Sequence, residues 1–132
     1  MMGLPASLLS DTYYFPSYNN VSLDEQLRFG NVGNADTTVT VTIGGVVRGT
    51  YLLHPSEQRR VNYPGLDSGP VVVQSTNSMI ITSALRDSWH DGTTWSSYSQ
   101  MMGLPASQLS TKYVFPSYNN VSLDEQLRFG VP

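Results

Sequence analysis

The chain has 132 residues, no cysteine, 13% charged residues and a formal net charge of −3. The lack of cysteine excludes disulfides and thiolate chemistry, and the acidic balance argues against nucleic-acid binding, which needs a clustered basic patch. No apolar run approaches the roughly 18–20 residues that span a bilayer, so we expect no membrane span.

The first thirty residues recur as residues 101–130. The two copies are identical at 26 of 30 positions, and the four differences are Leu8/Gln108, Asp11/Thr111, Thr12/Lys112 and Tyr14/Val114. Such a period is typical of an array whose units each need a neighbour. We therefore expect residues 1–100 to form one repeat unit and residues 101–132 to begin the next. We also expect the chain to be a window on a longer array, or a subunit built from one.

Residues 4–9 and their copy 104–109 each predict a single helical turn, because proline favours the first helical position. Short strands are predicted at residues 12–15 and 23–29. Residues 37–43 alternate strictly between Thr and Val or Ile, which is typical of a half-buried strand. Gly44-Gly45 then favours a two-residue hairpin turn, and residues 46–53 return as the partner strand.

The remaining predicted strands are bounded by turn residues such as His54-Pro55-Ser56, Pro64-Gly65 and Asp91-Gly92. They are residues 58–63, 71–74, 79–89, 95–100, 112–115 and 123–129. Of these, residues 71–74 are predicted to be central and buried on both faces.

Seven to nine short strands with frequent turns predict an all-β fold, an antiparallel β-sandwich of immunoglobulin-like architecture. A closed barrel is the main alternative. The predicted core consists of apolar side chains in these strands: Phe15, Tyr18, Leu27, Phe29, Val39, Val41, Ile43, Val72, Ile81 and Leu85.

Part of the chain resembles the bacterial cell-adhesion-related (CARDB-like) sandwich domain. The resemblance is carried by Phe29-Gly30-Asn31-Val32-Gly33, the alternating strand that follows, Gly44-Gly45-Val46 and Gly69-Pro70-Val71-Val72. The resemblance covers about residues 23–76. At the turn after Leu53 the chain departs from the usual glycine, since Pro55-Ser56-Glu57 stands there. The whole unit, with MMGLPASxLS, FPSYNN and LDEQLRFGNVGN, also resembles tandem repeats of very large secreted bacterial surface proteins. That resemblance implies a stalk, adhesin or filament.

We expect no catalytic, cofactor or metal site. Ser88, His90 and Asp91 lie in one predicted hairpin tip, where neighbouring residues cannot form a nucleophile–base–orienter line. His54 lies in another turn. Asp24 and Glu25 are adjacent on a strand and point to opposite faces, which is wrong for a glycosidase pair and indicates a solvated strand face.

Metal-ligand spacing is also missing, although Asp67, Asp87 and Asp91 fall in or near loops where a surface calcium site is an alternative. Trp89, Trp95 and Tyr98 offer an aromatic platform for stacking on sugars. We favour instead a pair of tryptophans packed across the hairpin.

The repeat predicts function most directly. Two copies of residues 18–30 compete for one strand position, which we expect beside residues 37–43. The second copy then pairs with another unit, through Tyr118, Leu123, Leu127 and Phe129. We expect a non-enzymatic structural repeat of a bacterial extracellular surface protein or filament, whose partners are copies of itself. A carbohydrate-binding module is the alternative.

Overall fold

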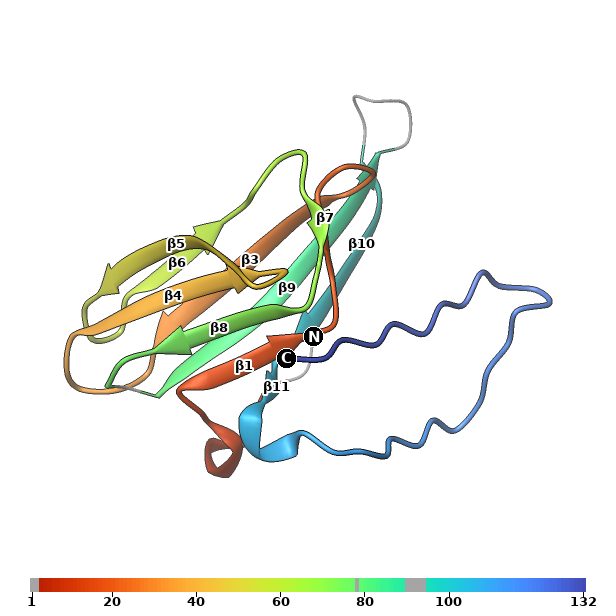
Figure 1. Ribbon diagram of the computed structural model, residues 1–132. Coiled ribbons are helices and arrows are strands. Elements are labelled where there is room, and N and C mark those ends of the chain that lie inside the picture. Colours follow the sequence, from red (N-terminus) through yellow and green to blue (C-terminus); the bar gives the residue numbers. More distant parts are fainter. Residues whose placement is uncertain (1–2, 78, 90–94) are drawn as a thin grey trace.

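The computed structural model describes residues 3–77, 79–89 and 95–132, and it is an antiparallel β-sandwich with a long C-terminal extension (Figure 1). One sheet has five strands in the spatial order β11 (Leu104–Pro105), β1 (Thr12–Phe15), β8 (Val71–Ser75), β4 (Thr37–Ile43) and β5 (Val46–Leu53). The facing sheet has four, in the order β10 (Trp95–Met102), β9 (Ile80–Trp89), β3 (Asp24–Asn31) and β6 (Gln58–Val61). The predicted sandwich is thereby confirmed over the closed barrel.

Four short elements complete the described structure. β2 (Tyr18–Asn19) and β7 (Asp67–Ser68) form a two-stranded ribbon. The single helical turns predicted after Pro5 and Pro105 are present as the 3-10 helices η1 (Ala6–Leu8) and η2 (Ala106–Gln108). In both, the proline precedes the helix as its N-cap residue rather than occupying its first position.

The core lies between the two sheets and follows the period-2 alternation of the strands. In β3 and β4 every second residue is buried. Eight of the ten predicted core residues are buried, and Val72 and Ile81 are not. Their neighbours Val71, Val73 and Ile80 point inward instead. β8 is central, as predicted, but Gln74 on its outer face is exposed, so it is not buried on both faces.

The hairpin of β4 and β5 was located correctly from the sequence. Gly44 and Gly45 have φ angles of +60° and +76°, which glycine adopts without steric cost. The predicted neighbour of β3 was wrong, because β3 pairs with β6 and β9 in the opposite sheet and not with β4. The alternation of a strand specifies which face is buried, but it does not specify the neighbouring strand.

The chain crosses from one sheet to the other at Gly103. β10 pairs with β9 up to Met102, the Gly103 N–H donates to the Thr82 carbonyl oxygen at 2.9 Å, and β11 then pairs with β1. The repeat boundary expected after residue 100 therefore falls inside β10. Residues 101–105 lie in the same sandwich as β1.

Gly103 and its equivalent in the first copy, Gly3, provide a matched test of the crossing between the two sheets. A Cβ at Gly103 would lie 2.7 Å from Thr82 Cγ2 and 3.0 Å from Phe15 Cζ, whereas a Cβ at Gly3 would meet nothing within 4 Å. We expect Gly103→Ala to lower the free energy of unfolding by about 1–3 kcal/mol, the cost of overpacking. Gly3→Ala should stay within about 0.5 kcal/mol of wild type in the same denaturant titration. Equal effects of the two changes would contradict the crossing.

Candidate assembly interface

The structure describes only some of the residues that were weighed as candidates for chemistry. His54 is exposed, and its Nδ1 lies 2.9 Å from Asp36 Oδ1. His90, Asp91 and Gly92 lie outside the described residues, so the predicted hairpin tip does too. Trp89 and Trp95 are paired in the backbone register of β9 and β10. Their side chains are not described, and the sugar platform stays a prediction of which only the exposed Tyr98 is in view.

Two negative findings apply to residues 3–77, 79–89 and 95–132. Within these ranges no three His, Cys, Asp or Glu side chains gather as a metal site requires. None of the helices there is long and apolar enough to pass through a membrane.

Glu25 is the residue whose environment differs most from the sequence-based interpretation. It is fully buried rather than solvated, and its Oε2 accepts the Asn19 N–H at 2.7 Å and lies 3.0 Å from Arg86 Nε. Burial raises the pKa of Glu25 above its ordinary value of 4.5, partly offset by the Asn19 N–H and the Arg86 charge. Asp24 points to the opposite face, as predicted.

The two copies of the repeat differ sharply in burial. Five aromatic or apolar side chains of the first copy are at most 2% exposed: Tyr13, Phe15, Tyr18, Leu27 and Phe29. Their counterparts are 45–81% exposed: Tyr113, Phe115, Tyr118, Leu127 and Phe129. The second copy thus exposes the apolar side chains that the first copy buries.

The tail, residues 109–132, nevertheless has most of the local hydrogen bonds of the first copy. Tyr118 Oη donates to the Glu125 carbonyl oxygen at 2.9 Å, and the equivalent distance in the first copy is 2.8 Å. The Ser110 N–H donates to Tyr113 Oη at 2.8 Å, against 3.0 Å between Ser10 and Tyr13. The tail is thus already shaped as the beginning of a sandwich.

The hydrogen bonds of the turn around Asn119 also match those of the first copy. The Asn119 N–H donates to Glu125 Oε2 at 2.6 Å, against 2.7 Å in the first copy, and Asn119 Nδ2 donates to Ser122 Oγ at 3.0 Å, against 2.9 Å. Asn119 Oδ1 also accepts the Val121 N–H at 3.0 Å, the same distance as in the first copy. These bonds join residues close in sequence, so they form without a neighbouring strand.

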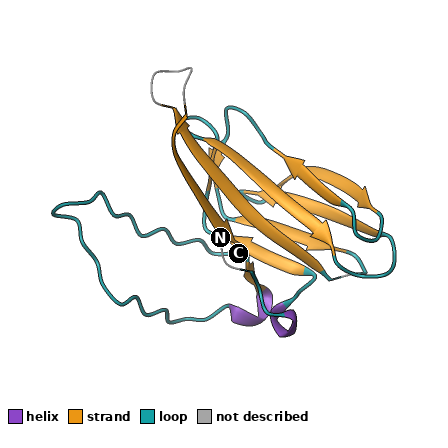
Figure 2. Cartoon of the chain, turned by 180° about the vertical axis from the view of Figure 1, so that it is seen from behind, coloured by secondary structure: helices purple, strands orange, loops and turns teal. Residues whose placement is uncertain are grey.

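What the tail lacks is a sheet. Residues 112–115 and 123–129 were predicted as strands, and within the described chain neither forms one. In the first copy the equivalent residues pair with β8 and β11, and with β6 and β9. The tail bows away from the sandwich, as both ribbon views show (Figures 1 and 2). Tyr118, Leu123, Leu127 and Phe129, the predicted pairing residues, are exposed there.

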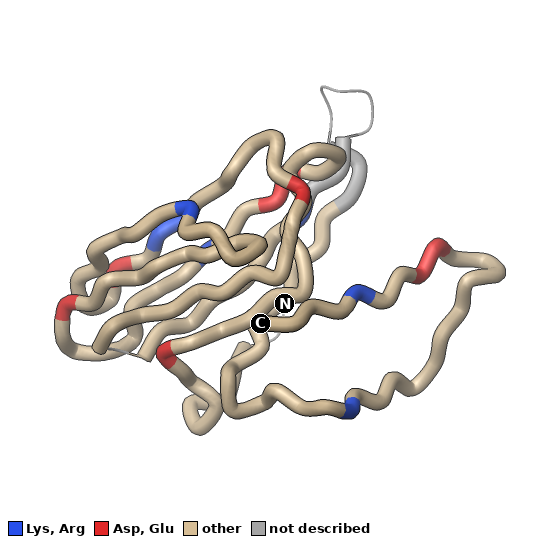
Figure 3. Tube along the Cα trace, viewed as in Figure 1, with Lys and Arg blue, Asp and Glu red and all other residues tan. Residues whose placement is uncertain are grey.

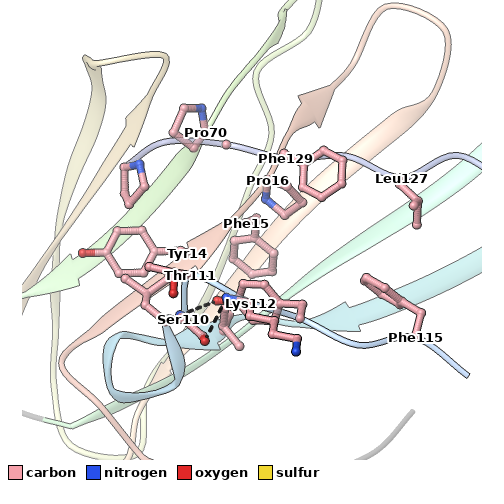
Figure 4. A pocket seen from close by; sticks show the side chains of 15 residues that line it. Tyr14, Phe15, Pro16, Pro70, Ser110, Thr111, Lys112, Phe115, Leu127 and Phe129 are labelled. Atoms are coloured by element: carbon pink, nitrogen blue, oxygen red, sulfur yellow. Dashed lines mark hydrogen bonds between the residues drawn. The ribbon is translucent and has the colours of Figure 1, made fainter.

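An apolar cavity of about 640 Å³ lies between the tail and the sandwich. Tyr14, Phe15 and Pro70 line it from the sandwich, and Phe115 and Phe129 line it from the tail (Figure 4). The sequence alone did not indicate this cavity. Its walls are mainly apolar, although Ser110, Thr111 and Lys112 also line it, so it presents apolar surface at the junction of tail and sandwich.

No protein-family model matches the chain, and no match is found among curated proteins. A solved structure described as the crystal structure of Thermotoga maritima 1070 superposes with a TM-score of 0.60. The match covers 71% of this chain and 92% of that chain at 14% sequence identity. The similarity supports the sandwich fold.

The contact between His54 and Asp36 gives a pH-dependent prediction. The hydrogen bond from the imidazole to the carboxylate raises the pKa of His54 above its ordinary value of 6.5. The stability that the His54–Asp36 pair contributes is therefore fully present below pH 6.5. It is lost as the pH rises through the raised pKa of His54. In an NMR titration we expect Asp36→Asn to lower the pKa of His54 towards 6.5. An unchanged titration curve would show that the pair does not form in solution.

Proposed function

We propose that this chain is a structural, non-enzymatic repeat unit of a bacterial extracellular surface protein or filament. Successive units assemble head-to-tail when the C-terminal copy of one enters the sandwich of the next. The main support is the tail itself, which has most of the local hydrogen bonds of the first copy but none of its sheet partners within the described chain. The extracellular location rests on composition and on the resemblance to secreted repeats.

The chemistry of strands explains why such a segment needs a partner. Unpaired N–H and C=O groups along an exposed strand are a template for pairing with another chain. The first copy needs β8, β9 and β6 as neighbours, with four, eight and four residue pairs respectively. A second sandwich offers the same strands. Because only four positions differ between the copies, the C-terminal copy can replace the first copy with nearly the same contacts.

Such contacts are heterologous, so two-fold symmetry does not close them. The donated segment and the accepting strands are different surfaces, so each added unit presents a new free tail. The expected product is a linear polymer. Exchange requires the resident copy to leave its position, so we expect assembly to be slow.

Electron microscopy of the full chain at several concentrations, after long incubation, tests this proposal. We expect unbranched filaments whose length increases with concentration, because each added unit presents another acceptor. Light scattering on the same samples should show the mean mass rising in parallel. Discrete monomers at the highest concentration, with a tail that is cleaved rapidly by protease, would contradict the proposal.

Leu27 and Leu127 separate folding from assembly, because they are the same residue of the two copies. Leu27 is fully buried and Leu127 is exposed. In dilute protein, Leu27→Ala should lower the free energy of unfolding by about 2–5 kcal/mol. Leu127→Ala should change it by less than about 0.5 kcal/mol.

In concentrated protein the second change should matter. We expect Leu127→Ala to shorten the filaments, because the leucine becomes buried when the tail enters another sandwich. Filaments of normal length with Leu127→Ala would show that the tail does not occupy the position of the first copy.

A further inference from the structure

One arginine of the sandwich holds the first copy of the repeat at two points. Arg86, on β9, lies with its Nε 3.0 Å from Glu25 Oε2. Its Nη2 donates to the Ser17 carbonyl oxygen at 3.1 Å and to Ser17 Oγ at 3.3 Å. Both partners belong to the thirty-residue repeat, whereas Arg86 does not. Arg86 is therefore a residue outside the repeat that binds the repeated segment.

The position of this contact makes it sensitive to register. Glu25 and Arg86 are direct partners in the ladder of β3 and β9. Glu25 is fully buried and the Arg86 side chain is 20% exposed. A one-residue shift of β3 would turn the carboxylate to the other face and leave the guanidinium without its partner. Breaking such a buried pair is costly because it leaves an uncompensated charge.

The tail presents the same two groups. Ser117 and Glu125 are identical to Ser17 and Glu25 in the printed sequence. Glu125 Oε2 is already held by the Asn119 N–H at 2.6 Å, as in the first copy. No ion pair to Glu125 is present within the described residues. The acidic residues of the tail lie on the part of the loop away from the sandwich (Figure 3).

We infer that Glu125 is the residue by which the tail selects and aligns its partner, and that Arg86 in the sandwich of a second copy of this chain binds its carboxylate. In that complex Glu125 takes the place of Glu25, and Ser117 takes the place of Ser17 beside the same guanidinium. The inference rests on the proposed function, since it requires the tail to enter another sandwich.

The neighbouring carboxylate provides a matched control. Asp24 points to the opposite face of β3 and accepts the Gln26 amide within its own strand at 2.9 Å. Asp124 has the same contact with Gln126 at 3.3 Å. Asp124 is thus adjacent to Glu125, carries the same charge and needs no arginine from another sandwich.

The first experiment compares Glu125→Gln with Asp124→Asn in the full chain. Both residues are in the tail, so circular dichroism should show an unchanged sandwich. Sedimentation over a concentration series measures the concentration at half-assembly. We expect Glu125→Gln to raise it by about tenfold or more, because a buried charge pair is lost, and Asp124→Asn to change it by less than about twofold. Assembly of Glu125→Gln like wild type would overturn the inference while leaving the head-to-tail assembly intact.

A double-mutant cycle then tests the pair itself. In an Arg86→Gln chain the added change Glu125→Gln should have no further effect, because the interaction that it removes is already absent. A second full loss in that background would show that Glu125 acts elsewhere and would overturn the inference.

Charge reversal gives the complementary result. Arg86→Glu places a carboxylate against Glu25. We expect chains with this change to assemble poorly, because Glu125 in the tail of one copy then meets a glutamate in the sandwich of the next. Adding Glu125→Arg to that chain should restore assembly, because the arginine in the tail then meets the glutamate in the sandwich. If Arg86→Glu does not fold, the cycle with glutamine still decides the inference. Failure of the wild-type chain to assemble at all would overturn both this inference and the proposed function.

Discussion

The pairing of β3 with β9 is the interaction on which the rest of the sandwich depends. It joins eight residue pairs, from Asp24 opposite Asp87 to Asn31 opposite Ile80. It also aligns Leu27 and Phe29 with the core. The tail shows what the same sequence does without this pairing, since it keeps its turns and its local hydrogen bonds but forms no strand. A strand requires a neighbour for its backbone N–H and C=O groups. Tertiary pairing, and not local propensity, therefore makes these residues a sheet.

This dependence explains how much of the fold could be predicted. Outside the tail, strand positions set by local pattern were correct, and the best case is the hairpin from Thr37 to Leu53, with Gly44-Gly45 at its turn. Where apolar residues run together, as at Val71–Val73 and Ile80-Ile81, no alternation indicates which of them points inward. The prediction that Val72 and Ile81 point into the core was therefore wrong. The partners of β3 lie far away in the sequence, so pattern alone could not identify them.

Glu25 shows that one part of the candidate site was predictable. Leu27 and Phe29 were both predicted to lie in the core, and the period of a strand places residue 25 on their face. The polar character of the residue led to the opposite interpretation. A buried carboxylate is stable only when it is paired and hydrogen-bonded. Its partner, Arg86, lies 61 positions further along the chain and could not be identified from the sequence alone.

The link between the sandwich and the second copy of β1 is short. Gly103, Leu104 and Pro105 close one sandwich, and η2 follows at once, so only residues 106–111 separate β11 from the copy of β1. A sandwich that receives the tail must then lie close to the edge formed by β11. β11 is short and ends its sheet, so that edge is unpaired in the described chain. The aromatic cavity beside it is bordered by the tail. A neighbour placed there would cover an open edge and apolar walls together, two features that favour association over an isolated sandwich.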